Sequence, residues 1–125
     1  MVEPLEDEPG EESLLGLDTR EVPGALILTV TGEIDLLTTP RLRAAVSECL
    51  DRADELLVVD LTQVSFLGSH GLAALVGAAQ ESANGRNKAP LRLVVDGNRP
   101  VVRPIQVTGL NEVLALYHSV PEALV

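Results

Sequence analysis

The sequence predicts an α/β fold in which helices pack mainly on one face of a mixed sheet of four to five strands. Three observations favour it. The 125 residues are enough for one domain. Apolar, β-branched runs alternate along the chain with segments of helical periodicity, as in domains where helices cover a sheet. Hydrophobic residues make up 46% of the chain and aromatic residues only 2%, so we expect an aliphatic core.

The first half of the chain is expected to hold three strands and one helix. Pro23-Gly24 is a turn signal between two apolar runs. The helix is expected over Pro40–Ala53, with Thr38 or Thr39 as its N-cap, because proline is tolerated at the first helical position. The expected strands are Leu14–Glu21, Ala25–Thr31 and Leu56–Leu61.

The second half continues the alternation. An alanine-rich helix is expected over Leu72–Ser82, ended by Asn84-Gly85. A helix over Pro100–Thr108 follows, capped by Asn98, and Pro104 is expected to kink it. The remaining elements are a strand at Leu91–Val95, a short edge strand at Leu114–Tyr117 and a last turn over Pro121–Leu124 capped by Ser119.

The two longest helices carry apolar stripes, so we expect them side by side on one face of the sheet. Cys49 is the only cysteine and falls on such a stripe, which indicates a small core residue. The residues expected to be buried are Leu42, Val46, Cys49, Leu72, Leu75 and Val76.

Charge divides the chain into a tail and a domain. Residues 1–12 hold six acidic residues and no basic one, and we expect them to be a disordered acidic tail before a domain at 13–125. The formal net charge of −10 argues against direct nucleic-acid binding. The acidic N-terminus and the short apolar runs predict a cytoplasmic protein without membrane insertion. The two histidines, His70 and His118, show no metal-ligand spacing, so no metal site is expected.

Two strand-to-helix junctions, Gly32–Pro40 and Phe66–Leu72, are where a site is expected, because such junctions meet at one edge of an α/β sheet. Ser69 lies at or just before the start of a helix. Ser69 is then either a simple N-cap or a phosphate-bearing position, since backbone N–H groups and the helix dipole favour an anion there.

These junctions resemble a known family. TGEIDLLTTPRL (31–42) and VVDLTQVSFLGSHGLAAL (58–75) are similar to the STAS family, and specifically to its anti-sigma factor antagonists. In that family a Gly-Glu-Ile/Leu-Asp segment precedes the first helix, and an Asp-Ser-Ser/Thr-Gly-Leu segment leads into the second. The resemblance covers roughly residues 14–124.

The resemblance implies a non-enzymatic binding protein in a regulatory cycle. The unphosphorylated antagonist binds an anti-sigma factor that is also a serine kinase, and the sigma factor is released. Phosphorylation of the serine that matches Ser69 ends binding, and a metal-dependent serine phosphatase restores it. The chain itself needs no cofactor, because ATP belongs to the partner kinase. The implied partner-binding residues are Glu33, Asp35, Thr38, Gly68, Ser69, His70, Gly71 and Leu72.

Two departures from the family pattern keep an alternative open. Gly68 stands where the family has aspartate, and His70 where it has serine or threonine. The chain is alternatively a STAS adaptor subunit without phosphorylation, for example of a lipid-transport ABC system. A hydrolase with Ser69, Asp96 and His118 in triad order is disfavoured, because a nucleophile elbow needs glycine where Leu67 stands.

Overall fold

The computed structural model describes residues 15–85 and 89–125, so the predicted acidic tail lies outside the described residues. Five strands form one sheet in the order β1-β2-β3-β4-β5. The first pair is antiparallel and the other three pairs are parallel, which confirms the predicted mixed sheet. The strands are β1 (Leu15–Val22), β2 (Ala25–Ile34), β3 (Leu57–Leu67), β4 (Leu91–Val94) and β5 (Leu116–Tyr117).

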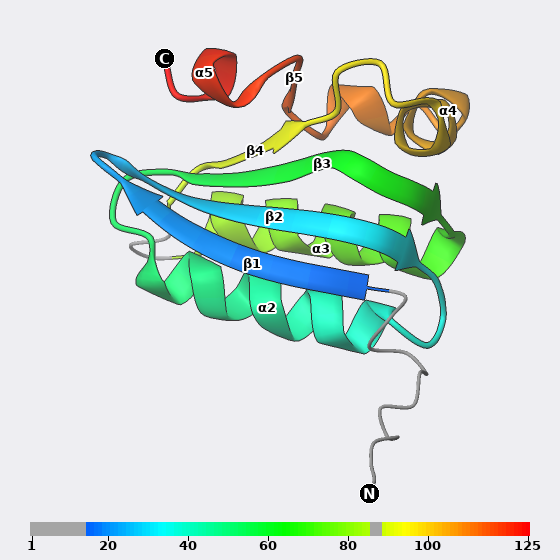
Figure 1. Ribbon diagram of the computed structural model, residues 1–125, viewed down its shortest axis with the longest axis horizontal. Helices are drawn as coiled ribbons and strands as arrows, with labels where there is room; N and C mark the ends of the chain where they lie inside the picture. Colours follow the sequence, from blue (N-terminus) through cyan, green and yellow to red (C-terminus); the bar gives the residue numbers. More distant parts are fainter. Residues whose placement is uncertain (1–14, 86–88) are drawn as a thin grey trace, which may run out of the picture.

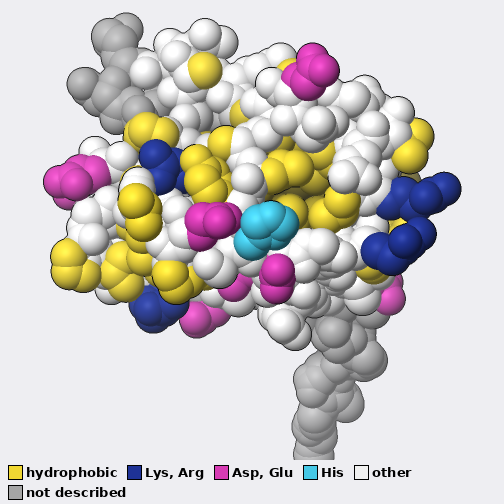
Figure 2. All heavy atoms as spheres, turned by 90° about the horizontal axis from the view of Figure 1, so that it is seen from above, with side chains coloured by type: hydrophobic (Ala, Val, Ile, Leu, Met, Phe, Trp, Pro, Cys, Tyr) yellow, Lys and Arg dark blue, Asp and Glu magenta, His cyan; other side chains and the backbone are white. Residues whose placement is uncertain are grey.

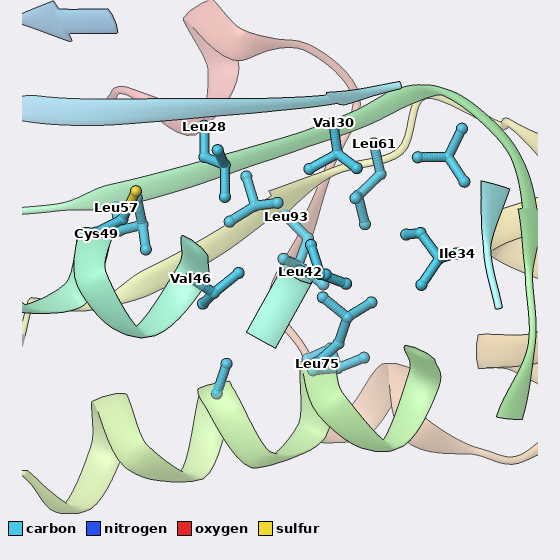
Figure 3. Packing of buried hydrophobic residues seen from close by; sticks show 14 of the residues in the cluster. Leu28, Val30, Ile34, Leu42, Val46, Cys49, Leu57, Leu61, Leu75 and Leu93 are labelled. Carbon is cyan, nitrogen blue, oxygen red and sulfur yellow. The ribbon is translucent and has the colours of Figure 1, made fainter. Parts of the chain in front are cut away.

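The two long helices lie side by side on one face of the sheet, as predicted (Figure 1). Leu42, Val46 and Cys49 of the first helix and Leu75 of the second belong to one buried cluster with residues of the strands above them (Figure 3). Val76 is only partly buried, because it lies at the margin of this cluster. The helices are α2 (Thr39–Arg52), α3 (Ser69–Asn84), α4 (Arg99–Val107) and α5 (Val120–Ala123), with a 3-10 turn, η1 (Leu110–Glu112), between the last two.

The opposite face of the sheet is covered only in part. Ala123 of α5 packs on Ile27, Val58 and Val94, which alternate along their strands with the residues of the larger core. Figure 2 looks onto this side, where Lys and Arg side chains fall into separate small groups. That distribution gives no continuous basic surface on this face.

Two strands run further than the sequence predicts. β2 continues from Thr31 to Ile34, because register shifts, one of them at Gly32 with φ +95°, let the strand go on pairing with β3. β3 continues from Leu61 to Leu67. Both strands therefore carry their ends to the junctions directly, without an intervening loop.

The side chain of Asn98 also supports the extended part of β3. Its Nδ2 donates to the carbonyl oxygens of Leu61 at 2.9 Å and of Val64 at 2.7 Å, where the strand is irregular. Asn98 occupies the N-cap position of α4 as predicted, but its amide is used on β3 and makes no cap bond. Ser119, in contrast, caps α5 as expected, accepting a bond from the N–H of Glu122.

Within the described ranges, no helix is long and apolar enough to cross a membrane. Over those same ranges, no group of three or more histidine, cysteine, aspartate or glutamate side chains is arranged to hold a metal ion.

Candidate functional site

The two strand-to-helix junctions lie side by side at one end of the sheet, as predicted (Figure 1). The N–H of Gly68 donates to the carbonyl oxygen of Ile34 at 2.9 Å, which joins the end of β3 to the end of β2. Gly71 then brings α3 against β2, since a Cβ at this position would lie 2.2 Å from Cγ2 of Ile34. A side chain at position 71 would push the two junctions apart.

The first junction is held by its own side chains. Oδ1 of Asp35 accepts bonds from the N–H groups of Leu37 and Thr38, each at 3.0 Å, and from the Thr38 hydroxyl at 3.1 Å. The Thr38 oxygen accepts from the N–H of Asp35 at 2.8 Å and lies 2.8 Å from the Glu33 carbonyl oxygen. Thr38 occupies the N-cap position of α2, yet its side chain makes no bond to that helix. It braces the junction instead.

These bonds favour the ionised form of Asp35. The N–H of Thr38 is the largest of several donors that hold the pKa of this carboxyl below its usual value, against a smaller opposing effect of desolvation. Asp35 therefore carries a full negative charge at neutral pH, in a fixed position before α2.

The second junction leaves its serine unengaged. Gly68 is the N-cap of α3 and Ser69 is the first helical residue, so α3 begins three residues earlier than predicted. Ser69 is exposed, and among the described residues its hydroxyl makes no hydrogen bond. The N–H groups of the first helical turn point toward it. Its position suits a phosphoacceptor: accessible, free of structural bonds, and next to backbone groups that favour an anion.

The accessible part of the two junctions is smaller than the predicted partner-binding set. Thr38, Gly71 and Leu72 are buried, so they position the surface without reaching it. Glu33, Asp35 and Gly68 are half-buried. We define the junction surface as the exposed Leu36, Leu37, Ser69 and His70 together with the half-buried carboxylate of Asp35.

Sequence reasoning missed what borders this surface. Leu36 and Leu37 are each 63% exposed, an unusual state for two adjacent leucines. Leu36 and His70 also line a groove of about 480 Å³ that includes Arg43 of α2. The helical spacing from Thr39 to Arg43 would have placed Arg43 on the same face of α2.

The hydrolase arrangement is not assembled. Asp96 and His118 approach each other, with Oδ1 and Nδ1 4.0 Å apart, in a hollow that Asp60 and Thr62 also line. Ser69 is not among the residues that line this hollow. The serine therefore has no general base from this pair.

A protein-family model, described as the STAS domain, matches residues 16–123. The chain belongs to the STAS domain family. The junction surface accordingly lies on a STAS domain in which Gly68 and His70 flank Ser69.

Known relatives of this STAS domain carry a consistent name. An anti-sigma-F factor antagonist of Mycobacterium tuberculosis is 33% identical over 101 residues, covering 81% of this chain and 80% of that protein. The crystal structure of an anti-sigma factor antagonist from Mycobacterium paratuberculosis matches with a TM-score of 0.78 at 32% identity, covering 88% of this chain and 91% of that one. The anti-sigma factor antagonist SpoIIAA in its unphosphorylated form shares the fold, with a TM-score of 0.65 at 20% identity over 86% of this chain and 92% of its own.

Proposed function

We propose that this STAS protein is an anti-sigma factor antagonist that binds an anti-sigma factor through the junction surface and is switched off by phosphorylation of Ser69. The observation that carries the proposal is the exposed, unengaged Ser69 hydroxyl at the start of α3. The preceding Gly68 bonds to the carbonyl oxygen of Ile34, the residue before the ionised Asp35. The relatives named as antagonists, at 32–33% identity over most of the chain, support the same activity.

The junction surface has the chemistry of a docking site. Leu36 and Leu37 offer apolar contact area, and Asp35 offers a fixed charge for a cation of the partner. Gly71 lets α3 lie close against Ile34 of β2, and the Ser69 hydroxyl is exposed at the start of that helix, where a partner can reach it. The partner of this proposal is an anti-sigma factor that is also a serine kinase and brings its own ATP.

Phosphorylation acts through charge. A phosphate on Ser69 adds about −1.5 to −2 charges at neutral pH, next to the carboxylate of Asp35. Donors at the start of α3 stabilise that phosphate within the free chain, whereas in a complex it would face Asp35 with water excluded. The modification therefore favours the free chain over the complex. A metal-dependent serine phosphatase would reverse the step, and we place the cycle in the cytoplasm.

The test uses purified full chain, its cognate anti-sigma factor and ATP. Mass spectrometry should find one phosphate on Ser69, and titration calorimetry should show that Ser69→Ala binds like the wild type. Ser69→Asp should bind more weakly by about 2–5 kcal/mol, the usual cost of an unpaired charge in an interface. Ser65→Asp is the matched control, because Ser65 is exposed on β3 outside the junction surface, and it should bind normally.

Two results would overturn the proposal. Absence of phosphate on Ser69, together with full-strength binding by Ser69→Asp, would leave a constitutive binder without a switch. Capture of a transporter ATPase in place of an anti-sigma factor from the native cytosol would point to the adaptor alternative.

A further inference from the structure

Strand β1 forms one outer edge of the sheet, and within the described residues it pairs only with β2 (Figure 1). Its eight residues keep one regular register with β2, without the bulges that often interrupt an edge strand. Its sequence also lacks the proline and lysine that proteins commonly place on such strands. β1 therefore offers a continuous row of backbone groups to a further strand.

The backbone groups that face this open edge belong to every second residue. The carbonyl oxygen of Leu15 accepts a bond from Nη1 of Arg41 at 3.1 Å, so it points away from β2. The direction of the backbone groups alternates along a strand in an antiparallel pair. The two-residue turn that joins β1 to β2 gives the same alternation, because the residues flanking such a turn hydrogen-bond to each other. The N–H and C=O groups of Leu17, Thr19 and Glu21 therefore point outward.

The charges of β1 lie on the other face of the strand from its core residues. Leu15 belongs to the core beneath the sheet, so Asp18 and Arg20, at odd spacings from it, lie on the opposite face. Both are exposed, and neither makes an ion pair in the part of the chain that the structure describes. Exposed charges usually keep an edge strand from pairing with another copy. Here an acidic and a basic residue stand two positions apart, so the pattern complements itself.

The complementarity appears when two copies of β1 run antiparallel and Thr19 of one faces Thr19 of the other. Each Asp18 then lies opposite an Arg20 of the other copy, and this occurs twice. Opposite charges that face each other across two strands stabilise the pair, and like charges destabilise it.

Charge also selects this register over its neighbours. Outward-facing residues pair only with outward-facing residues, so the possible registers differ by steps of two. A step in one direction brings the two Asp18 side chains opposite each other. A step in the other direction brings the two Arg20 side chains together. Only the register centred on Thr19 pairs unlike charges.

We propose that β1 pairs antiparallel with β1 of a second copy of this chain, about a two-fold axis at Thr19, so that the two sheets become one. Leu17, Thr19 and Glu21 of each copy exchange backbone bonds with Glu21, Thr19 and Leu17 of the other. Joining two strand edges makes a small interface, so we expect a dissociation constant on the order of 100 μM. Asp18 and Arg20 lie outside the junction surface, and the proposal does not rest on the proposed function.

The test is sedimentation velocity of the full chain from about 10 μM to 1 mM, where the wild type should pass from monomer to dimer. Asp18→Arg makes all four facing positions basic, and Arg20→Asp makes all four acidic. Each variant alone should dimerise at least ten-fold more weakly than the wild type. In an equimolar mixture of the two variants, an arginine lies opposite an aspartate in both pairs. The mixture should therefore associate within about three-fold of wild-type affinity.

Two controls separate facing charges from net charge. Glu112→Arg changes the net charge as Asp18→Arg does, and Arg103→Asp changes it as Arg20→Asp does. Glu112 and Arg103 are exposed and lie outside β1. Both control variants should dimerise like the wild type.

Cross-linking tests the position of the two-fold axis. Thr19→Cys, oxidised with copper phenanthroline, should form a disulfide-linked dimer at least ten-fold faster than Glu21→Cys. The residues at position 19 face each other across the axis, whereas those at position 21 lie about 14 Å apart. Cys49 does not interfere, because it is 2% exposed and burial raises the pKa of its thiol.

Four results would overturn the proposal. The first is a wild type that stays monomeric up to 1 mM, and the second is a dimer that neither Asp18→Arg nor Arg20→Asp weakens. The third is a mixture of these variants that associates no better than each variant alone. The fourth is cross-linking at position 21 as fast as at position 19, which would place the second copy in another register or on another surface.

Discussion

The two strand-to-helix junctions sit side by side, yet they use their side chains in opposite ways. Between β2 and α2, Asp35 and Thr38 bond to each other and to the backbone, and the buried Thr38 is fully engaged. Between β3 and α3, the N-cap is a glycine and no side chain caps the helix. The Ser69 hydroxyl makes no hydrogen bond within the part of the chain that the structure describes. The first junction is built for rigidity and the second for access.

The difference teaches how a small domain can carry a modifiable residue without instability. Backbone contacts at Gly68 and Gly71 fix the second junction to the first, so Ser69 has no structural task. A charge added to Ser69 then changes what the surface can bind while the fold persists. Substitutions at the two junctions should therefore distinguish residues that stabilise the fold from residues that affect only binding.

The largest effect on the free energy of unfolding is expected at Gly71, where the two junctions touch. Gly71→Ala should destabilise the fold by about 1–3 kcal/mol, because the new Cβ would meet Ile34 and Leu67 at 2.2 and 2.9 Å. Gly77→Ala makes the same change in the same helix with nothing within 4 Å, and should stabilise by up to about 1 kcal/mol. Urea denaturation of both variants measures the difference. Equal stabilities would show that the approach of α3 to β2 is not tight.

The next largest effect on stability is expected at Thr38, whose hydroxyl holds the first junction together. Thr38→Val keeps the shape of the side chain but leaves the N–H of Asp35 and the carbonyl of Glu33 without their hydroxyl partner, at a cost of about 1–2 kcal/mol. Thr108→Val removes an exposed hydroxyl that bonds to Pro104 in α4, and should cost less than about 0.5 kcal/mol. Thermal unfolding of both variants tests this expectation, and a larger loss of stability in Thr108→Val than in Thr38→Val would refute it.

Acid should weaken the first junction selectively. The pKa of Asp35 is lower in the folded chain than its ordinary value of 3.8, so the stability it contributes is fully present above about pH 4. That contribution is lost as the pH falls through the lowered value. The stability of Asp35→Asn should therefore approach that of the wild type as the pH falls from 5 to about 2. Parallel curves for the two chains in urea denaturation would contradict the assignment.

The smallest effect on stability is expected at Gly68, where no side chain caps the start of α3. Gly68→Asp supplies a carboxylate for the free N–H groups of α3 and should stabilise by a few tenths of a kcal/mol. A Cβ there would meet the ring of Phe66 at 3.2 Å, and this half-exposed ring has room to move. A clear loss of stability would mean that the ring is fixed.

Local signals predicted most of the fold. Helical periodicity located α2 and α3, and Pro40 marked the start of α2 to within one residue. The strand ends were wrong because Thr62, Gln63 and Ser65 are typical of a loop. The bonds that keep this stretch in β3 come from its pairing with β2 and from Asn98, both more than thirty residues away. No local pattern carries that information.

The site, too, has features that local sequence predicts and features that depend on tertiary packing. The position of Ser69 at a helix start followed from the pattern of strand and helix, which is a local property. The groove with Arg43, and the burial of Thr38 and Leu72, depend on how α2 and α3 pack together. Such properties become visible only once the helices are placed.

The amide of Asn98 also has a consequence for motion. Two carbonyl groups of β3 share this one side chain, and its own backbone begins α4, so the last stretch of β3 cannot open unless the start of α4 lets go. We expect amide hydrogen exchange in Thr62–Leu67 and in the first turn of α4 to proceed at matching rates, as a single cooperative unit. Asn98→Ala should uncouple the two segments, because this stretch of β3 would then be held by its pairing with β2 alone. Opening of the strand that leads to Ser69 is therefore coupled to opening of the start of α4, although the Asn98 bonds reach only Leu61 and Val64.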